Sequence, residues 1–471
     1  MLRKRFLSLT CALVLCLSLL PVTALAEGTA PQTLYVGSTT ISAGYWTSSD
    51  GGTTWARQEN QPEGNNYIYY DGQGTLKLHN ATIQRGSITG SAPFGSGIYA
   101  LSSSNQPVAL TIELIGKNTI TGNYGIYVDA QQGGTVGTNA SLLIQNSDDD
   151  GSLEVSGSSY GIYVKSGTGN ASLTIKDASV VASCCSSYGS YAGVCVHSGS
   201  DATSSPKLSL AVDGGSLTTS ASKGNDGIQF YVGANGVTSE TTSLSVTNNA
   251  IVDARNGGIR ASGVSVNPNV NIGSTDSTSG IVFDGTEGTV YGNVELQKDL
   301  EIKSGETLTI PEGSTLNTNN NLTNNGTIVN TGDTLNGEPD GTGKIETTPT
   351  IDTQPENQTV TAGNTATFTV DANGENLSYQ WQQKTTDSGS DWTNVGSATS
   401  SNTYTIDNTT TSMSGYQYRC VVNNSAGSVT SNAVTLTVNA ATVPVTGVSL
   451  TPASLSLFTG DTATLTATVQ P

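Results

Sequence analysis

The sequence predicts an all-β protein, in which a single-stranded parallel β-helix is followed by one complete and one truncated β-sandwich module. Three observations predict this fold class. A Gly followed by a short apolar strand recurs between residues 97 and 283. Short segments that alternate apolar and polar residues lie between the copies. Outside the first 26 residues, no segment has the 3.6-residue period of an amphipathic helix.

The Gly-containing strand occurs at steps of 28, 36, 32, 34, 31 and 22 residues. Its seven copies begin at Gly97, Gly125, Gly161, Gly193, Gly227, Gly258 and Gly280. A recurring step of this size indicates one supersecondary unit stacked on copies of itself. A β-sandwich is the alternative, but a sandwich does not repeat its strands at a near-constant step.

Each repeat contains two further short strands. The first reads Leu-x-Ile/Leu/Val, as at 110–112 and 173–175, and the second follows it, as at 153–155 and 250–252. Gly, Ser, Asn and Asp separate the strands and favour turns. Three strands per turn, stacked about 4.8 Å apart on the next turn, make the coil of a parallel β-helix.

A stack of coils has two ends that must be covered. Shorter steps after residue 283 predict a tapered closing turn at the C-terminal end. At the other end we expect an aromatic plug, formed by Trp46, Trp55, Tyr67, Tyr69 and Tyr70.

Residues 1–26 have the pattern of a secretory signal peptide. A basic start is followed by an apolar run at 6–20 and by the small-residue cleavage motif at 24–26. A transmembrane anchor is the alternative, but the run is short and no second apolar span follows. We therefore expect a secreted protein with no transmembrane segment in the mature chain, attached to a cell surface through sequence beyond residue 471.

The mature chain is strongly acidic. It has 15 Lys and Arg residues against 37 Asp and Glu residues, a net charge of −22. Nucleic acid is therefore not an expected partner. Four cysteines remain after the leader: Cys184, Cys185, Cys195 and Cys420. Cys184 or Cys185 could form a disulfide with Cys195, or all three could fill interior positions.

The segment 351–438 resembles a bacterial immunoglobulin-like domain. The residues that carry the resemblance lie at 363–370, 379–381 and 415–422. It implies that Trp381 packs between two sheets and that Tyr418 forms the tyrosine corner. Val370 stands where the family often has its first Cys, so the resemblance implies no disulfide for Cys420.

Residues 445–467 resemble the opening strands of a bacterial immunoglobulin-like group 2 domain, and the chain ends in mid-domain. The expected organisation has four parts. They are the signal peptide at 1–26, the β-helix at 27–345, the immunoglobulin-like domain at 346–439 and the partial group 2 domain at 440–471.

The repeats themselves resemble a clostridial carbohydrate-binding β-helix family. The stretches that carry this resemblance are 67–70, 74–83, 114–120 and the Gly-Ile-Tyr-Val copies. The family binds acidic plant polysaccharide, so the resemblance implies a polysaccharide or a host or plant glycan as partner.

A column of tyrosines is the candidate carbohydrate-binding site: Tyr99, Tyr127 and Tyr163. Successive strand residues point to opposite sides, so these rings are expected on the outer face if the flanking Ile and Val residues point inward. Exposed aromatic rings suit the apolar faces of sugars. The alternative is a tyrosine ladder that only covers the strands.

A column of carboxylates is the candidate metal site: Asp148, Asp149, Asp150, Asp177 and Asp213. Each follows a first strand of a repeat, so stacking would bring them into one turn region. Hard oxygen ligands at that density suit calcium. A solvated acidic edge is the alternative.

The most favoured function is non-catalytic glycan binding or adhesion, with immunoglobulin-like modules as spacers. A structural stalk or protein-binding adhesin is the first alternative. A polysaccharide lyase or glycoside hydrolase is the second, with Arg255 and Arg260 as candidate bases of a lyase. Only His79 and His197 are available as histidines, and no paired acid and base is recognisable.

Overall fold

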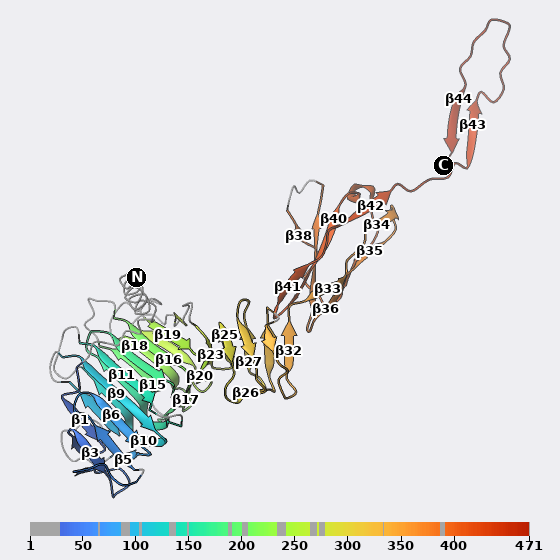
Figure 1. Ribbon diagram of the computed structural model, residues 1–471. Coiled ribbons are helices and arrows are strands. Elements are labelled where there is room, and N and C mark those ends of the chain that lie inside the picture. Colours follow the sequence, from blue (N-terminus) through green and yellow to red (C-terminus); the bar gives the residue numbers. More distant parts are fainter. Residues whose placement is uncertain are drawn as a thin grey trace, which may run out of the picture. The chain divides into compact units, whose positions relative to one another are not determined.

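The computed structural model describes residues 29–64, 66–85, 95–102, 106–130, 138–147, 150–186, 191–199, 206–232, 242–263, 271–272, 278–332, 334–386 and 391–470. The leader at 1–26 lies outside these residues. Within them the chain is all-β, as predicted, apart from a single-turn 3-10 helix at Thr411–Met413. The chain divides into two compact units, 1–345 and 346–471 (Figure 1).

The first unit contains three ladders of strands. In the first ladder every neighbour is parallel, and the chain returns to it once per repeat. Its strands are β6 (Thr75–His79), β9 (Val108–Ile115), β11 (Ala140–Asn146), β13 (Ala171–Lys176), β16 (Leu208–Asp213), β19 (Thr242–Thr247) and β22 (Asn271–Ile272). Antiparallel strands extend it beyond β6, namely β5 (Tyr67–Tyr70), β3 (Gly44–Thr47) and β4 (Ala56–Gln58).

The second ladder is also parallel throughout. It contains β7 (Thr82–Gln84), β10 (Lys117–Asp129), β12 (Ser152–Ser166), β14 (Ser179–Cys184), β17 (Ser216–Ala221), β20 (Ala250–Ala254) and β23 (Gly280–Asp284).

The third ladder carries the Gly-Ile-Tyr-Val strands. It contains β8 (Ile98–Leu101), the C-terminal parts of β10 and β12, β15 (Ala192–Ser198), β18 (Asp226–Val232) and β21 (Ile259–Gly263). The antiparallel β1 (Thr33–Val36) and β2 (Thr39–Ile41) continue it beyond β8. Six of the seven Gly copies lie here. The seventh, at Gly280, pairs instead with β20 in the second ladder. The third ladder therefore contains six copies of the Gly-containing strand rather than seven.

The chain continues after β23 in shorter strands with a separate interior. β24 (Glu287–Tyr291) runs antiparallel to β23 and parallel to β27 (Thr307–Ile310), which pairs with β30 (Thr327–Asn330). Two smaller parallel sets lie beside them. These are β25 (Asn293–Glu295), β28 (Thr315–Asn317) and β31 (Leu335–Asn336), and β26 (Leu300–Ile302) with β29 (Leu322–Asn324). β32 (Lys344–Thr347) spans the boundary between the units.

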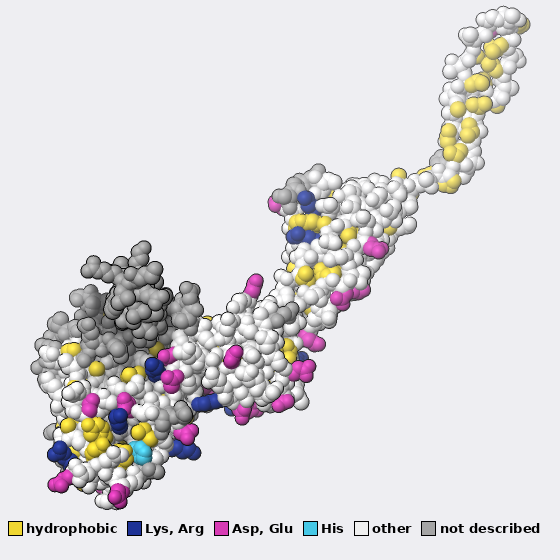
Figure 2. All heavy atoms as spheres, in the orientation of Figure 1, with side chains coloured by type: hydrophobic (Ala, Val, Ile, Leu, Met, Phe, Trp, Pro, Cys, Tyr) yellow, Lys and Arg dark blue, Asp and Glu magenta, His cyan; other side chains and the backbone are white. Residues whose placement is uncertain are grey.

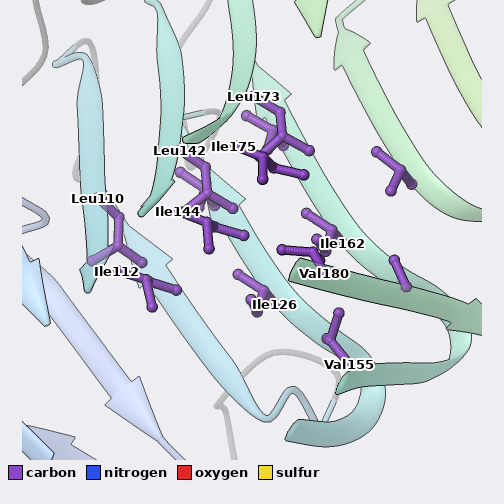
Figure 3. Packing of buried hydrophobic residues seen from close by; sticks show 14 of the residues in the cluster. Leu110, Ile112, Ile126, Leu142, Ile144, Val155, Ile162, Leu173, Ile175 and Val180 are labelled. Atoms are coloured by element: carbon purple, nitrogen blue, oxygen red, sulfur yellow. The ribbon is translucent and has the colours of Figure 1, made fainter. Parts of the chain in front are cut away.

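The main core of the first unit is built from side chains of all three ladders (Figure 3). Equivalent residues of successive repeats are direct partners, as Leu110, Leu142 and Leu173 are in the first ladder. Alternate residues of β11 are buried, so one face of the strand points inward. Stacking like on like gives continuous apolar rows, which bury their surface against the rows of the other ladders.

The second unit has the strands of a β-sandwich. One sheet contains β34 (Gln358–Thr361), β42 (Val434–Asn439), β40 (Gln417–Asn424), β37 (Ser378–Lys384), β38 (Thr393–Asn394) and β41 (Gly427–Thr430). β35 (Ala366–Thr369) pairs with β39 (Thr403–Ile406), and β33 (Thr350–Thr353) with β36 (Asp371–Asn373).

The core of this sandwich contains Trp381, Tyr418 and Cys420, so the expected packing of Trp381 in the interior is confirmed. The final segment forms a hairpin of β43 (Gly447–Thr451) and β44 (Thr466–Gln470).

Candidate functional site

The predicted tyrosine column exists, but its rings are not exposed. Tyr127 pairs directly with Tyr99 on one side and Tyr163 on the other, and both ring-centroid distances are 5.0 Å. The rings point away from the main core and belong to a second apolar cluster. Their exposed fractions are only 3% for Tyr99, 4% for Tyr127 and 7% for Tyr163. The prediction of an exposed column is therefore wrong, and glycan binding by these three rings stays a prediction.

The burial has a physical cause that lies in neighbouring aromatic residues. Tyr124 and Tyr160 precede the Gly of their strands, are direct partners in the ladder, and are half-buried. The Tyr160 ring stacks on Tyr163 at 4.6 Å, and the Tyr124 ring stacks on Tyr127 at 4.9 Å. Tyr124 and Tyr160 also stack on each other at 5.7 Å with an interplanar angle of 20°. Tyr124 and Tyr160 form the outer layer of a two-layer aromatic cluster. We call this outer pair the tyrosine rim.

Polar side chains form hydrogen bonds with the hydroxyl groups of the inner layer, which consists of Tyr99, Tyr127 and Tyr163. Asp129 Oδ2 accepts hydrogen bonds from Tyr127 Oη at 2.9 Å and from Tyr99 Oη at 3.3 Å. Burial raises the pKa of both phenols well above the ordinary value, so they remain donors. Tyr163 Oη and His197 Nδ1 share a hydrogen bond. Burial, together with the charge of Lys165, lowers the pKa of His197 to about 3, so its imidazole is neutral at physiological pH.

The column changes character in the next three repeats. The positions that follow Tyr163 are Cys195, Gln229 and Arg260. Gln229 is buried, and its Nε2 donates to Asp226 Oδ2 at 3.2 Å. Arg260 Nη1 lies 3.9 Å from Asp226 Oδ1. Burial raises the pKa of Asp226, although Arg260 and Gln229 act against the shift.

A polar group of hydrogen-bonding residues thus continues the line of the tyrosine rim along the ladder. Sequence reasoning missed Asp226 and Gln229. The available signal was their position in the repeat, which is the one that holds Tyr160 and Tyr163 two strands earlier.

The predicted acidic column is only partly assembled. Asp148 and Asp149 lie outside the described residues, and Asp150 and Asp177 are exposed. Asp177 and Asp213 do stack, because the Asp177 backbone N–H donates to the Asp213 carbonyl at 2.8 Å. The Asp213 carboxylate, however, accepts from Thr247 Oγ1 at 2.7 Å and Asn248 Nδ2 at 2.5 Å.

Among the described residues, no group of three His, Cys, Asp or Glu side chains is placed to hold a metal ion. Calcium binding by the acidic column therefore stays a prediction.

The cysteines and the candidate lyase bases are accounted for by local contacts. Cys184, Cys185, Cys195 and Cys420 are all free, so the interior-filling alternative fits the buried Cys184 and Cys195. Arg255 lies over the Phe283 ring at 3.9 Å, with Nε 3.4 Å from Glu306 Oε2.

Within the described ranges, no helix is long and apolar enough to cross a membrane. No curated protein is detectably similar to the chain.

Solved structures resemble one part of the chain. Titin domain M7 is 32% identical over 20% of this chain and 97% of its own, with a TM-score of 0.17. The chimeric titin Z1Z2 structure is 25% identical over 20% of this chain and 95% of its own, with a TM-score of 0.16. The structure of Sidekick-1 immunoglobulin domains 1–4 is 24% identical over 19% of this chain and 22% of its own, with a TM-score of 0.17. Residues 349–438 match the family model of the immunoglobulin I-set domain, which indicates a role in adhesion or protein binding.

Proposed function

We propose that residues 27–345 form a parallel β-helix that binds glycan without catalysis, in a secreted or cell-surface adhesion protein whose immunoglobulin-like module is a spacer. The three parallel ladders, which the chain revisits in the same order in each repeat, support this interpretation of the fold. The leader pattern at 1–26 supports export.

The tyrosine rim is the observation that carries the glycan proposal. Tyr124 and Tyr160 are half-buried, nearly parallel to each other and held in place by a second layer of buried rings. A pre-oriented aromatic surface binds a sugar ring without losing side-chain freedom on association. Arg260, further along the same ladder, has a side chain that is 50% exposed and supplies donors suited to sugar hydroxyls.

The test is affinity electrophoresis of the mature chain in gels that contain pectin, xylan or mucin. Replacing both Tyr124 and Tyr160 by Ala removes two aromatic contacts of about 1 kcal/mol each, so binding should weaken at least roughly tenfold. The control variant replaces both by Phe, which keeps the stacking rings and should keep most of the affinity.

Thermal melts must show that both variants remain folded. Equal retardation of the Ala variant and the parent would contradict a site at the rim. Lack of retardation of the parent in any gel would favour the alternative of a structural stalk or protein-binding adhesin, which the I-set match supports.

A further inference from the structure

A second aromatic cluster lies on the outer face of the first ladder, at its N-terminal end. Tyr45 of β3, Tyr67 and Tyr69 of β5 and His79 of β6 contribute to it. Tyr45 and Tyr69 lie 4.7 Å apart between ring centroids, Tyr45 and Tyr67 5.7 Å, and Tyr67 and His79 4.8 Å. Figure 2 shows hydrophobic, His and Lys or Arg side chains together over β3, β5 and β6.

This arrangement corrects the expected N-terminal plug. Trp46, Trp55 and Tyr70 do lie in the main core. Tyr67 and Tyr69 alternate with the core residues Ile68 and Tyr70, so they lie on the opposite face of β5.

The cluster continues into a straight polar row across the ladder. Tyr45 pairs with Tyr69, Tyr69 with Lys77, and Lys77 with Glu113. At a strand spacing of about 4.8 Å, this row spans roughly 14 Å. Half-buried Tyr45 and Tyr69 thus lead directly to a charged pair on the same face.

The polar members of the row are held in place by each other. Lys77 Nζ lies 2.7 Å from Glu113 Oε2, and Glu113 also accepts from Gln145 Nε2 at 3.2 Å. The hydrogen bond to Glu113 raises the pKa of Lys77. Burial acts to raise the pKa of Glu113, but Lys77 holds it below its ordinary value. Both groups are therefore charged at neutral pH, and the pair carries no net charge.

We propose that this surface, the Tyr45–Tyr69 platform, is a second binding site, and that its ligand is an uncharged polysaccharide. Aromatic rings offer the surface that the apolar face of a sugar needs, and the adjoining Lys–Glu pair offers donors and acceptors for hydroxyls. The local charge is balanced, and a net charge of −22 on the mature chain repels polyanions. The inference rests on the proposed glycan-binding function and departs from the acidic ligand that the family resemblance implies.

The experiment uses the mature full chain in native gels that contain galactomannan, hydroxyethylcellulose or polygalacturonate. Four proteins are compared with the parent: Tyr45→Ala with Tyr69→Ala, the matched pair Tyr45→Phe with Tyr69→Phe, the rim variant Tyr124→Ala with Tyr160→Ala, and the combination of both Ala pairs. We expect retardation of the parent by a neutral polymer, roughly tenfold weaker binding by the platform Ala variant, and near-parent binding by the Phe variant.

Tyrosine nitration of the parent provides a measurement that needs no variant. Bound galactomannan or hydroxyethylcellulose should slow the reaction of Tyr45 and Tyr69 with tetranitromethane, as followed by mass spectrometry of the peptides. Protection of these rings would support the site even if the Ala variant fails to fold.

Three outcomes overturn the inference, and they differ from one another. If the rim variant loses binding while the platform variant and the nitration rates are unchanged, the platform is not a site and the proposed function stands. Stronger retardation by polygalacturonate than by both neutral polymers overturns the uncharged class. If the parent is retarded in no gel, the proposed function fails together with the inference.

Discussion

His197 is the single residue whose environment most directly predicts a measurable property. It is held neutral in the fold, with a pKa of about 3, whereas an unfolded His takes up a proton near pH 6.5. Between these values the unfolded chain binds the extra proton. The contribution of His197 to the free energy of unfolding is therefore fully present above about pH 6.5. It falls as the pH drops, by at most about 1.4 kcal/mol per pH unit.

The first prediction follows from that sign. His197→Gln cannot be protonated, so the variant should lose less stability than the parent between pH 6.5 and about 4. Urea unfolding at half-unit pH steps gives the two curves, and the difference between them removes the contribution of carboxylates that titrate in the same range. The curves should run parallel above pH 7. Parallel curves throughout the acid range would show that His197 does not titrate as inferred.

At this scale the sequence predicts direction better than exposure. Alternation correctly places Ile126 in the main core and Tyr127 on the other side of the strand. Whether an outward ring meets solvent depends on what stacks against it, here Tyr124 and Tyr160, which lie three residues before Tyr127 and Tyr163 on the same strands. The Tyr45–Tyr69 platform escaped notice for the same reason, although the alternation within 67–70 was a usable signal.

At the scale of elements, the recurring Gly is explained by close approach of strands. A Cβ at Gly161 would lie 2.6 Å from the carbonyl oxygen of Gly193 and 2.9 Å from the backbone nitrogen of Ser183. Both atoms belong to backbone, which cannot rotate away as a side chain can. The third ladder can therefore pack against the second only where the side chain is absent.

The second prediction is that Gly161→Ala destabilises the first unit by roughly 1–3 kcal/mol, as overpacking usually does. The midpoint of denaturant unfolding measures it. Ser172→Ala, a similarly small change at an outer position of β13, is the control and should stay within about 0.5 kcal/mol of the parent. Equal stability of the Gly161 variant and the control would mean that the strands separate at little cost.

Arg255 connects β20 to the shorter strands that follow. Besides its contacts with Phe283 and Glu306, its Nη2 donates to the Glu301 carbonyl at 2.8 Å. The side chains of Arg255 and Glu306 are only 12% and 11% exposed. Removing the guanidinium leaves the Glu306 carboxylate largely buried without its cation.

The third prediction is that Arg255→Met costs about 2–3 kcal/mol, because a charge left unpaired in a partly buried site is expensive. The same change at Arg260 should cost less, because its side chain is 50% exposed and its Nη1 lies 3.9 Å from Asp226 Oδ1, so solvent screens this longer ion pair. Chemical denaturation of both variants at neutral pH makes the comparison. A smaller loss for Arg255 than for Arg260 would contradict the structural role assigned here.

For the whole molecule, repetition is what makes the architecture readable from the sequence. Leu110, Leu142 and Leu173 are in register because each coil buries a side chain at the same position of its strand. One sequence pattern therefore predicts many contacts. The pattern fails where the chain changes ladder. Gly280 has the repeat signature, but the shortened final step delivers it to β20 rather than β21. A sequence period predicts how many strands there are, but it does not predict which strand each one pairs with.

The two units have separate hydrophobic cores that share no residue. The fourth prediction is that the full chain unfolds in two transitions that single mutations shift one at a time. Phe368 is fully buried in the second unit, and Phe368→Ala should lower the free energy of unfolding of that unit alone, by about 3–5 kcal/mol. Leu142 is 1% exposed in the first unit, and Leu142→Ala should lower the free energy of unfolding of the first unit alone, by about 2–5 kcal/mol. Differential scanning calorimetry of the parent, both single variants and the double variant distinguishes the cases. Independent cores require the two losses to appear together and unchanged in the double variant. A single transition that both substitutions shift would show that the units fold as one cooperative body, and the second unit would then be no mere spacer.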